Sequence, residues 1–290
     1  MRRWRWAATM PRKRPWERGH MSDVDLHDKV VIVTGAGRGI GRALAQGFGR
    51  ESAKVVVVGR RLGTPDDPES LSHTAKLIAD AGGAALPVQG AVWDMAAMQQ
   101  VAYRAVRHFG GVDILVNNAG MYYAETFSDM TLEQWKETLD GYLTGAFVCS
   151  KVVVPLLIER GGGRIIHLGS NAANSTDAGA FAYGVIRGGM VRMTIKMAAD
   201  LKQQKVAVNS YGPGFVRTER VVQVVGDGNP ALSRARQPED TVPEVLWLAR
   251  QPLDYTGNVL YNNEFGKTWG PGVAAQEFKH DTAPQWQQGR

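Results

Sequence analysis

The chain has 290 residues, of which 44% are hydrophobic and 21% charged, and this composition excludes a largely disordered protein. The net charge of +6 arises in residues 1–20, which hold seven Lys and Arg against Glu17, so no nucleic-acid partner is expected for the remainder. The single cysteine, Cys149, excludes an internal disulfide and a CxxC metal or redox site, so we expect no metal and a reducing, cytoplasmic compartment.

The chain begins with a basic extension, residues 1–24, for which we predict no fixed structure. It is rich in arginine and has no apolar stretch of the length that a secretory signal needs. Three interpretations stay open: sequence upstream of a true start at Met21, an organelle transit peptide, and a basic arm that contacts a membrane or nucleic acid.

From residue 29 onward, short β-branched runs alternate with longer helical patterns, which indicates βαβ units. The expected strands are 29–33, 54–58, 84–89, 112–116, 164–168, 206–210 and 258–261. The expected helices are one that ends near Phe48, then 70–81, 95–108, 132–159 and 181–203. Because the strands are almost uniformly apolar, helices should cover both faces of the sheet.

These elements predict a single doubly wound α/β domain of the Rossmann type. Its sheet should be mainly parallel and seven-stranded, and the dinucleotide-binding domain should cover residues 25–267. A polar, weakly structured tail is expected at 268–290.

The helix expected at 132–159 is strongly apolar in its second half. Its part 146–158 is apolar nearly all round, which favours burial against the sheet and against a second subunit. The uninterrupted apolar run 152–158 contains Pro155 and is far too short for a membrane span. We expect a homodimer or homotetramer and no membrane.

A glycine-rich turn, Thr34-Gly35-Ala36-Gly37-Arg38-Gly39-Ile40-Gly41, joins the first strand to the first helix. Glycines let the backbone approach a pyrophosphate, and the helix N-terminus offers free N–H groups and a positive dipole end. The strand-turn-helix setting favours a dinucleotide site over an ordinary turn. We expect cofactor binding at Thr34, Gly35, Arg38, Gly39, Ile40 and Gly41.

The end of the second strand indicates which dinucleotide binds. A carboxylate that binds the ribose 2′-hydroxyl of NAD usually stands about 20 residues past the glycines. Here that end reads Val58-Gly59-Arg60-Arg61, and Arg60, Arg61 and Arg38 can pair with a 2′-phosphate. NADP(H) is therefore expected, with NAD(H) less favoured. The alternative, that these are solvated surface arginines, stays open.

Four motifs follow one another in a known order. They are Thr34-Gly35-xxx-Gly39-x-Gly41, Asn117-Asn118-Ala119-Gly120, Ser170 with Tyr183 thirteen residues later, and Pro213-Gly214 with Thr218 just beyond. Over residues 27–265 this pattern resembles the short-chain dehydrogenase/reductase family.

The resemblance implies hydride transfer between a nicotinamide and the carbon of a small carbonyl compound or alcohol. Tyr183 would give or take the proton, and Ser170 would bind the substrate oxygen. Asn117, Ala119 and Gly120 would lie beside the nicotinamide ribose. Pro213, Gly214 and Thr218 would cover the cofactor, with Thr218 at the carboxamide.

Three positions depart from the family pattern. Arg187 stands four residues after Tyr183 where the family has lysine; it keeps the positive charge that a tyrosine base needs but cannot release a proton. Tyr142 replaces an asparagine that holds a water in the proton relay. Ala91 replaces an aspartate that binds the adenine amine, a hydrogen bond worth about 1 kcal/mol.

Three other polar side chains and one segment are not assigned to the catalytic step. We interpret His167 as a packed strand residue. Tyr122 and Tyr123 could line the substrate pocket or pack in a loop. The segment 219–236 is expected to be a mobile lid with a partly apolar inner face.

Two functions are carried forward. The first is an NADP(H)-dependent oxidoreductase for a ketone or secondary alcohol, catalytic through Ser170, Tyr183 and Arg187 and slowed by the departures. The alternative is a cofactor-binding homologue with little or no catalysis and a structural or sensing role. The substrate itself is left open among acyl thioesters, sugars and steroids.

Overall fold

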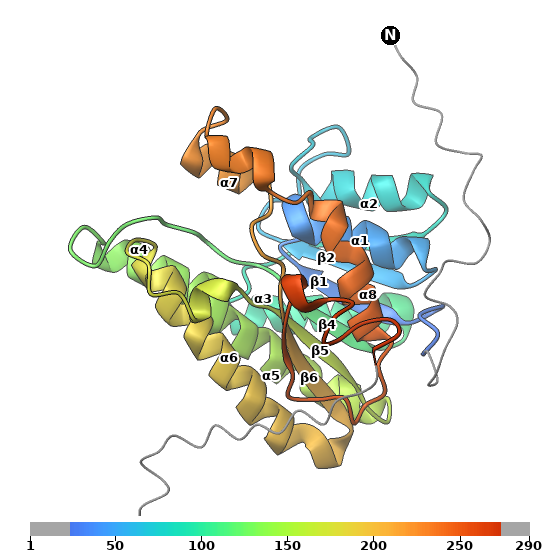
Figure 1. The fold of residues 1–290 in the computed structure, drawn as a ribbon. Helices are drawn as coiled ribbons and strands as arrows, with labels where there is room; N and C mark the ends of the chain where they lie inside the picture. Colours follow the sequence, from blue (N-terminus) through green and yellow to red (C-terminus); the bar gives the residue numbers. More distant parts are fainter. Residues whose placement is uncertain (1–23, 274–290) are drawn as a thin grey trace, which may run out of the picture.

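The computed structural model describes residues 24–273. Its seven strands form one entirely parallel sheet in the order β3-β2-β1-β4-β5-β6-β7, so the predicted doubly wound α/β fold is confirmed (Figure 1). The strands are β1 Val30–Thr34, β2 Lys54–Gly59, β3 Ala84–Gln89, β4 Ile114–Asn117, β5 Gly163–Leu168, β6 Val206–Gly212 and β7 Val259–Tyr261. The basic extension lies, except for its last residue, outside the described residues.

Successive strand residues point to opposite sides of the sheet, so these almost uniformly apolar strands make both faces apolar. Helices cover both faces for this reason. The helices are α1 Gly39–Arg50, α2 Leu71–Asp80, α3 Met95–Phe109, α4 Leu132–Leu139, α5 Gly145–Glu159, α6 Phe181–Leu201, α7 Glu219–Val225 and α8 Val242–Ala249. Val31 and Val33 pack with α1, α2 and α8, whereas Val30 and Ile32 pack with α3, α5 and α6. Strand order reverses between β1 and β4, so a ligand crevice is expected at their carboxyl ends.

The single helix expected at 132–159 is interrupted. Residues Asp140–Thr144 form a π-helical turn between α4 and α5. Gly145, the first residue of α5, allows close packing directly after this turn, since a Cβ there would lie 2.5 Å from Val92 Cγ2. By length and composition, Leu132–Glu159 could cross a membrane, yet half of its apolar window is buried inside this domain.

The C-terminal tail enters the core at its beginning. Trp269 is only 2% exposed, donates its indole N–H to Tyr261 O at 3.0 Å, and packs against Phe265 and Trp247. The polar composition of 268–290 concealed the apolar anchor at Trp269, and residues 274–290 lie outside the described part of the chain. The buried domain therefore extends at least to residue 269.

Candidate active site

The glycine-rich turn is packed so closely that glycine is required. Gly35 has a φ of +65°, and a Cβ at Gly41 would lie 2.3 Å from Gly35 O and 2.5 Å from Asn118 Nδ2. Helix α1 begins at Gly39 with Arg38 as its N-cap, without a side-chain cap and without an acid in its first turn. Its free N–H groups fit a dinucleotide phosphate.

Thr34 joins this turn to the loop that follows β4. Its hydroxyl accepts hydrogen bonds from the backbone N–H groups of Asn118 and Ala119, at 3.0 and 3.1 Å. The Asn118 amide returns a bond to Thr34 O at 2.8 Å. The motif-based expectation left Asn118 out of the site, although the second asparagine of Asn-Asn-Ala-Gly was the available signal. Ile40 is half-buried against the core.

The side chain of Asn117 is buried, and its amide contacts core side chains. Its amide nitrogen lies 3.2 Å from both Ser150 Oγ and His167 Nδ1. His167 is fully buried, as its interpretation as a packed strand residue requires. Burial lowers the pKa of His167 to about 4, so the ring is neutral near pH 7.

The three arginines expected at a 2′-phosphate already have partners. Arg38 pairs with Glu69 at 2.7 Å, Arg61 pairs with Asp67 at 2.8 Å, and Arg60 lies over the Trp93 ring at 5.8 Å. The acids belong to the loop between β2 and α2, and sequence reasoning overlooked them because it considered only the strand end. These ion pairs are partly exposed, so a phosphate can exchange with the carboxylates at low cost.

Tyr183, in the first turn of α6, lies within an aromatic cluster. The ring of Tyr122 meets it edge-on at 5.2 Å between centroids, and the ring of Tyr142 does so at 5.5 Å. Burial raises the pKa values of Tyr122 and Tyr142, which keeps both phenols neutral. Tyr123 instead donates to Glu137 at the surface, so only Tyr122 of the adjacent pair faces Tyr183.

Arg187 lies one helical turn beyond Tyr183, as its spacing predicts. Its guanidinium carbon is 4.8 Å from the centre of the Tyr183 ring and 3.9 Å from that of Tyr142. One nitrogen donates to Leu168 O, at the end of β5. Although burial opposes the charge, the two phenols raise the pKa of Arg187 above its ordinary value, so it stays cationic.

Ser170 follows β5 and caps the short 3₁₀ turn Asn171–Ala173. Its hydroxyl accepts from Ala172 N at 3.2 Å, and this turn packs against α6. A Cβ at Gly184 would lie 3.5 Å from Ala172 O, so the Ser170 loop and the residue after Tyr183 are in contact. The structure thus places the loop of Ser170 against the helix that carries Tyr183 and Arg187.

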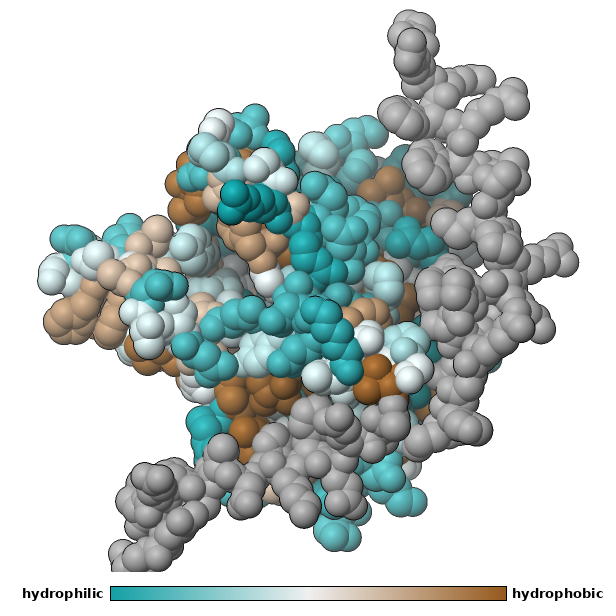
Figure 2. Space-filling view, viewed as in Figure 1, coloured by the Kyte–Doolittle hydropathy of each residue, from teal (hydrophilic) through white to brown (hydrophobic). Residues whose placement is uncertain are grey.

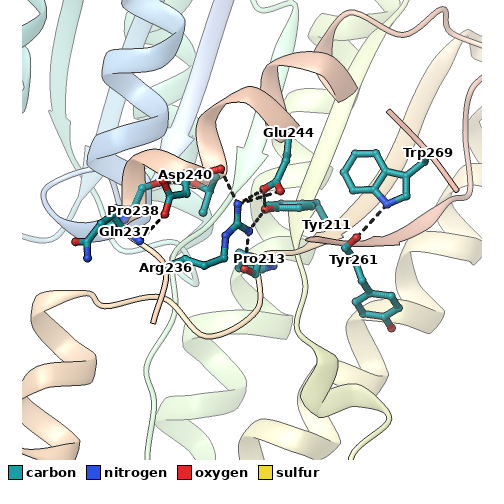
Figure 3. Close-up of polar contacts among 10 residues, drawn as sticks. Tyr211, Pro213, Arg236, Gln237, Pro238, Asp240, Glu244, Tyr261 and Trp269 are labelled. Carbon is teal, nitrogen blue, oxygen red and sulfur yellow. Dashed lines mark hydrogen bonds and ion pairs between the residues drawn. The ribbon is translucent and has the colours of Figure 1, made fainter. Parts of the chain in front are cut away.

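The segment 219–236 was predicted to be a lid. Its last residue, Arg236, lies in a polar network that includes Pro213, just after β6 (Figure 3). Arg236 donates to Pro213 O at 3.0 Å, to Tyr211 Oη at 3.2 Å, and to both carboxylate oxygens of Glu244 at 2.9 Å. Burial raises the pKa of Glu244, while Tyr211 and Arg236 oppose that rise. The network holds Pro213, where the segment that was predicted to cover the cofactor begins.

The other end of that segment meets the glycine-rich turn. Thr218 caps α7, and its Cβ and Cγ2 would lie within 3.2 Å of a Cβ at Gly39. Glu219 pairs with Arg42 at 3.2 Å, and a cavity of about 380 Å³ opens beside these residues. Pro213, Gly214 and Thr218 therefore belong to one segment that extends from the sheet to the N-terminus of α1.

Comparisons with known proteins agree with this fold. Residues 29–227 match the family model for short chain dehydrogenases. The chain is 33% identical over 232 residues to a 3-oxoacyl-[acyl-carrier-protein] reductase of Synechocystis, which covers 78% of this chain and 91% of that protein. It is 30% identical over 251 residues to glucose 1-dehydrogenase 2 of Bacillus subtilis. That match covers 82% of this chain and 94% of the relative.

A solved structure extends the likeness to three dimensions. It is described as an NAD(P)-dependent gluconate 5-dehydrogenase from Beutenbergia cavernae with NADP bound at low occupancy. The TM-score is 0.72 at 30% identity, over 82% of this chain and 96% of that one. Fold and site together define an oxidoreductase of the Rossmann class. The chain belongs to the short-chain dehydrogenase/reductase family.

Proposed function

We propose that the chain is an NADP(H)-dependent oxidoreductase that interconverts a ketone and a secondary alcohol in a reducing, cytoplasmic compartment. The observation that carries this proposal is the cationic Arg187 packed against Tyr183, on a helix that contacts the Ser170 loop. When bound, NADP(H) supplies or accepts the hydride. Tyr183 gives or takes the proton of the substrate oxygen, and Ser170 donates a hydrogen bond to that oxygen.

The cofactor would lie along the carboxyl ends of β1 and β4. The uncapped α1 N-terminus beyond Gly35 supports phosphate binding there. Ala119 and Gly120 would border the nicotinamide ribose, with Thr218 at the carboxamide. The group Arg38, Arg60 and Arg61 favours NADP(H), because the 2′-phosphate can replace Glu69 and Asp67 as their partner.

The substrate class is a small carbonyl compound with an apolar part. Phe127, Trp135 and Phe181 form an aromatic group near the start of α6, with Phe127 75% exposed. In Figure 2 the surface over α4 and the start of α6, on the left, carries tan and brown residues. An exposed apolar surface near the start of α6 favours acyl and steroid ketones over sugars as substrates.

One observation supports the second candidate, a cofactor-binding homologue without turnover. Tyr142 is bulky and fills the space over Gly120, where a Cβ would lie 1.6 Å from Tyr142 Cε1. An asparagine at this position could hold a relay water, whereas the buried ring leaves no such amide. The two candidates differ in turnover and agree in NADPH binding.

NADPH oxidation with a panel of acetoacetyl-coenzyme A, a 3-oxosteroid, an aryl ketone and a keto sugar tests the proposal. We expect turnover of at least one ketone, and Tyr183→Phe should lower its rate by roughly a hundredfold or more. NADPH binding, followed by its fluorescence, should be retained in Tyr183→Phe. Binding without turnover of any panel compound would favour the second candidate.

A further inference from the structure

Arg187 is a buried cation without an acidic partner. It is 6% exposed, and among residues 24–273 no carboxylate lies within ion-pair distance of it. Its Nε has no hydrogen-bond partner within the same residues. A buried charge is costly unless other groups compensate it, so its environment must supply that compensation.

Two aromatic rings and a carbonyl supply it. The guanidinium carbon lies 3.9 Å from the centre of the Tyr142 ring, closer than the 4.8 Å to Tyr183. Leu168 O and, at 3.3 Å, the sulfur of Met190 are further contacts of the guanidinium. Cation–π attraction is strongest where water is excluded, as it is here. Tyr142 is therefore the principal aromatic partner of Arg187.

The backbone around Tyr142 is built to place its ring. Tyr142 lies in the π-helical turn Asp140–Thr144, and such turns redirect side chains within a helix. Gly141 allows the turn to approach the loop after β4, since a Cβ there would lie 3.2 Å from Met121 N. The ring then covers Gly120, the one residue type that leaves room for it.

We propose that Tyr142 is a positioning residue, whose ring holds the Arg187 guanidinium against Tyr183. The proposal rests on the proposed function of Tyr183 and deepens it. The two departures from the family pattern thus form a matched pair. An asparagine at 142 would leave the guanidinium without its nearest ring, and a lysine at 187 would bury a more strongly hydrated ammonium beside two rings.

The pair is tested by turnover of whichever ketone of the panel the full chain reduces fastest. Tyr142→Leu removes the ring and keeps an apolar side chain, whereas Tyr142→Phe keeps the ring. We expect Tyr142→Leu to lower kcat by about tenfold or more, the effect of losing a desolvated cation–π contact. Tyr142→Phe should retain at least about half of kcat. NADPH affinity and thermal unfolding identify variants that act through misfolding.

A double-mutant cycle supplies the second arm. We expect Arg187→Lys and Tyr142→Asn each to lower kcat, and the double variant to lose less than the product of the two losses. Deuterated NADPH should give a larger isotope effect on kcat in Tyr142→Leu than in the unaltered chain, because the chemical step has slowed.

The outcomes separate the two proposals. A chain that reduces no panel ketone overturns the proposed function and this role with it. If the unaltered chain turns over a ketone, either of two results overturns the positioning role alone. The first is that Tyr142→Leu reacts as fast as Tyr142→Phe, and the second is that the losses of kcat in the double-mutant cycle multiply. The positioning role is also overturned if Tyr142→Leu and Tyr142→Phe lower kcat by the same factor and lower the unfolding temperature by the same amount.

Discussion

At the scale of the residue, the candidate site centres on Arg187, whose guanidinium lies over the rings of Tyr142 and Tyr183. The four-residue separation predicted that Arg187 lies beside Tyr183, and the structure places it there. The contact between Tyr142 and Arg187 depends on a π-helical turn, for which the sequence carries no regular signal. Tyr142, interpreted from sequence as damage to a relay, is in our proposal the aromatic partner of Arg187.

His167 gives a pH-dependent prediction at this scale. Its folded-state pKa of about 4 lies below the ordinary 6.5, so the unfolded chain binds the proton first. The stability that the neutral ring contributes is complete above pH 6.5 and is lost as the pH falls to about 4, at a cost of roughly 3 kcal/mol.

Urea unfolding between pH 4 and pH 7 measures this loss. The matched variant His167→Gln keeps a polar side chain of similar size but does not titrate in this range. The unaltered chain should lose more stability than the variant as the pH falls. Parallel pH profiles for the two proteins would contradict the assignment of this loss to His167.

At the scale of the element, strand and helix positions followed from apolar patterns, whereas loop partners did not. The basic strand end Arg60-Arg61 could be recognised in the sequence because it follows a uniformly apolar strand. Asp67 and Glu69 were overlooked, since pairing between a strand end and a loop depends on how the loop folds back. The pairing of Arg236 with Glu244 was likewise hidden, although it ties the end of the segment 219–236 to α8 (Figure 3).

The loop between β2 and α2 carries the prediction for cofactor choice. Arg60→Ala/Arg61→Ala should weaken NADPH binding by about tenfold or more, because charge-assisted bonds to the 2′-phosphate are lost. NADH binding should change little, since NADH lacks that phosphate. Fluorescence titration with NADPH and with NADH measures the ratio of the two binding affinities. A similar weakening for both cofactors would place these arginines outside the 2′-phosphate site.

At the scale of the whole molecule, the order of elements predicted the sheet, and the outer surface points to self-association. One face of α5 presents Phe147, Lys151, Pro155 and Ile158 outward, at helical spacing. Phe147 is 53% and Ile158 42% exposed, although the helix lies against the sheet on its other side. Large apolar side chains on one outward stripe favour burial against a second copy of the chain.

Light scattering after size-exclusion chromatography tests this association. The full chain should have the mass of a homodimer or homotetramer, and Phe147→Arg should reduce it by introducing a charge into the contact. Tyr103→Arg, on the exposed side of α3, is the control and should leave the mass unchanged. A monomeric unaltered chain, or equal effects of both variants, would contradict an α5 interface.

The central claim is that Tyr183 and Arg187 support hydride transfer from NADPH to a ketone. Its most direct test is NADPH carrying deuterium at the transferable position, incubated with the panel ketone that is reduced fastest and followed by mass spectrometry of the alcohol. The account predicts deuterium on the carbinol carbon, formed at least about a hundredfold more slowly by Tyr183→Phe. Absence of the label, or equal rates for the unaltered chain and Tyr183→Phe, would contradict it.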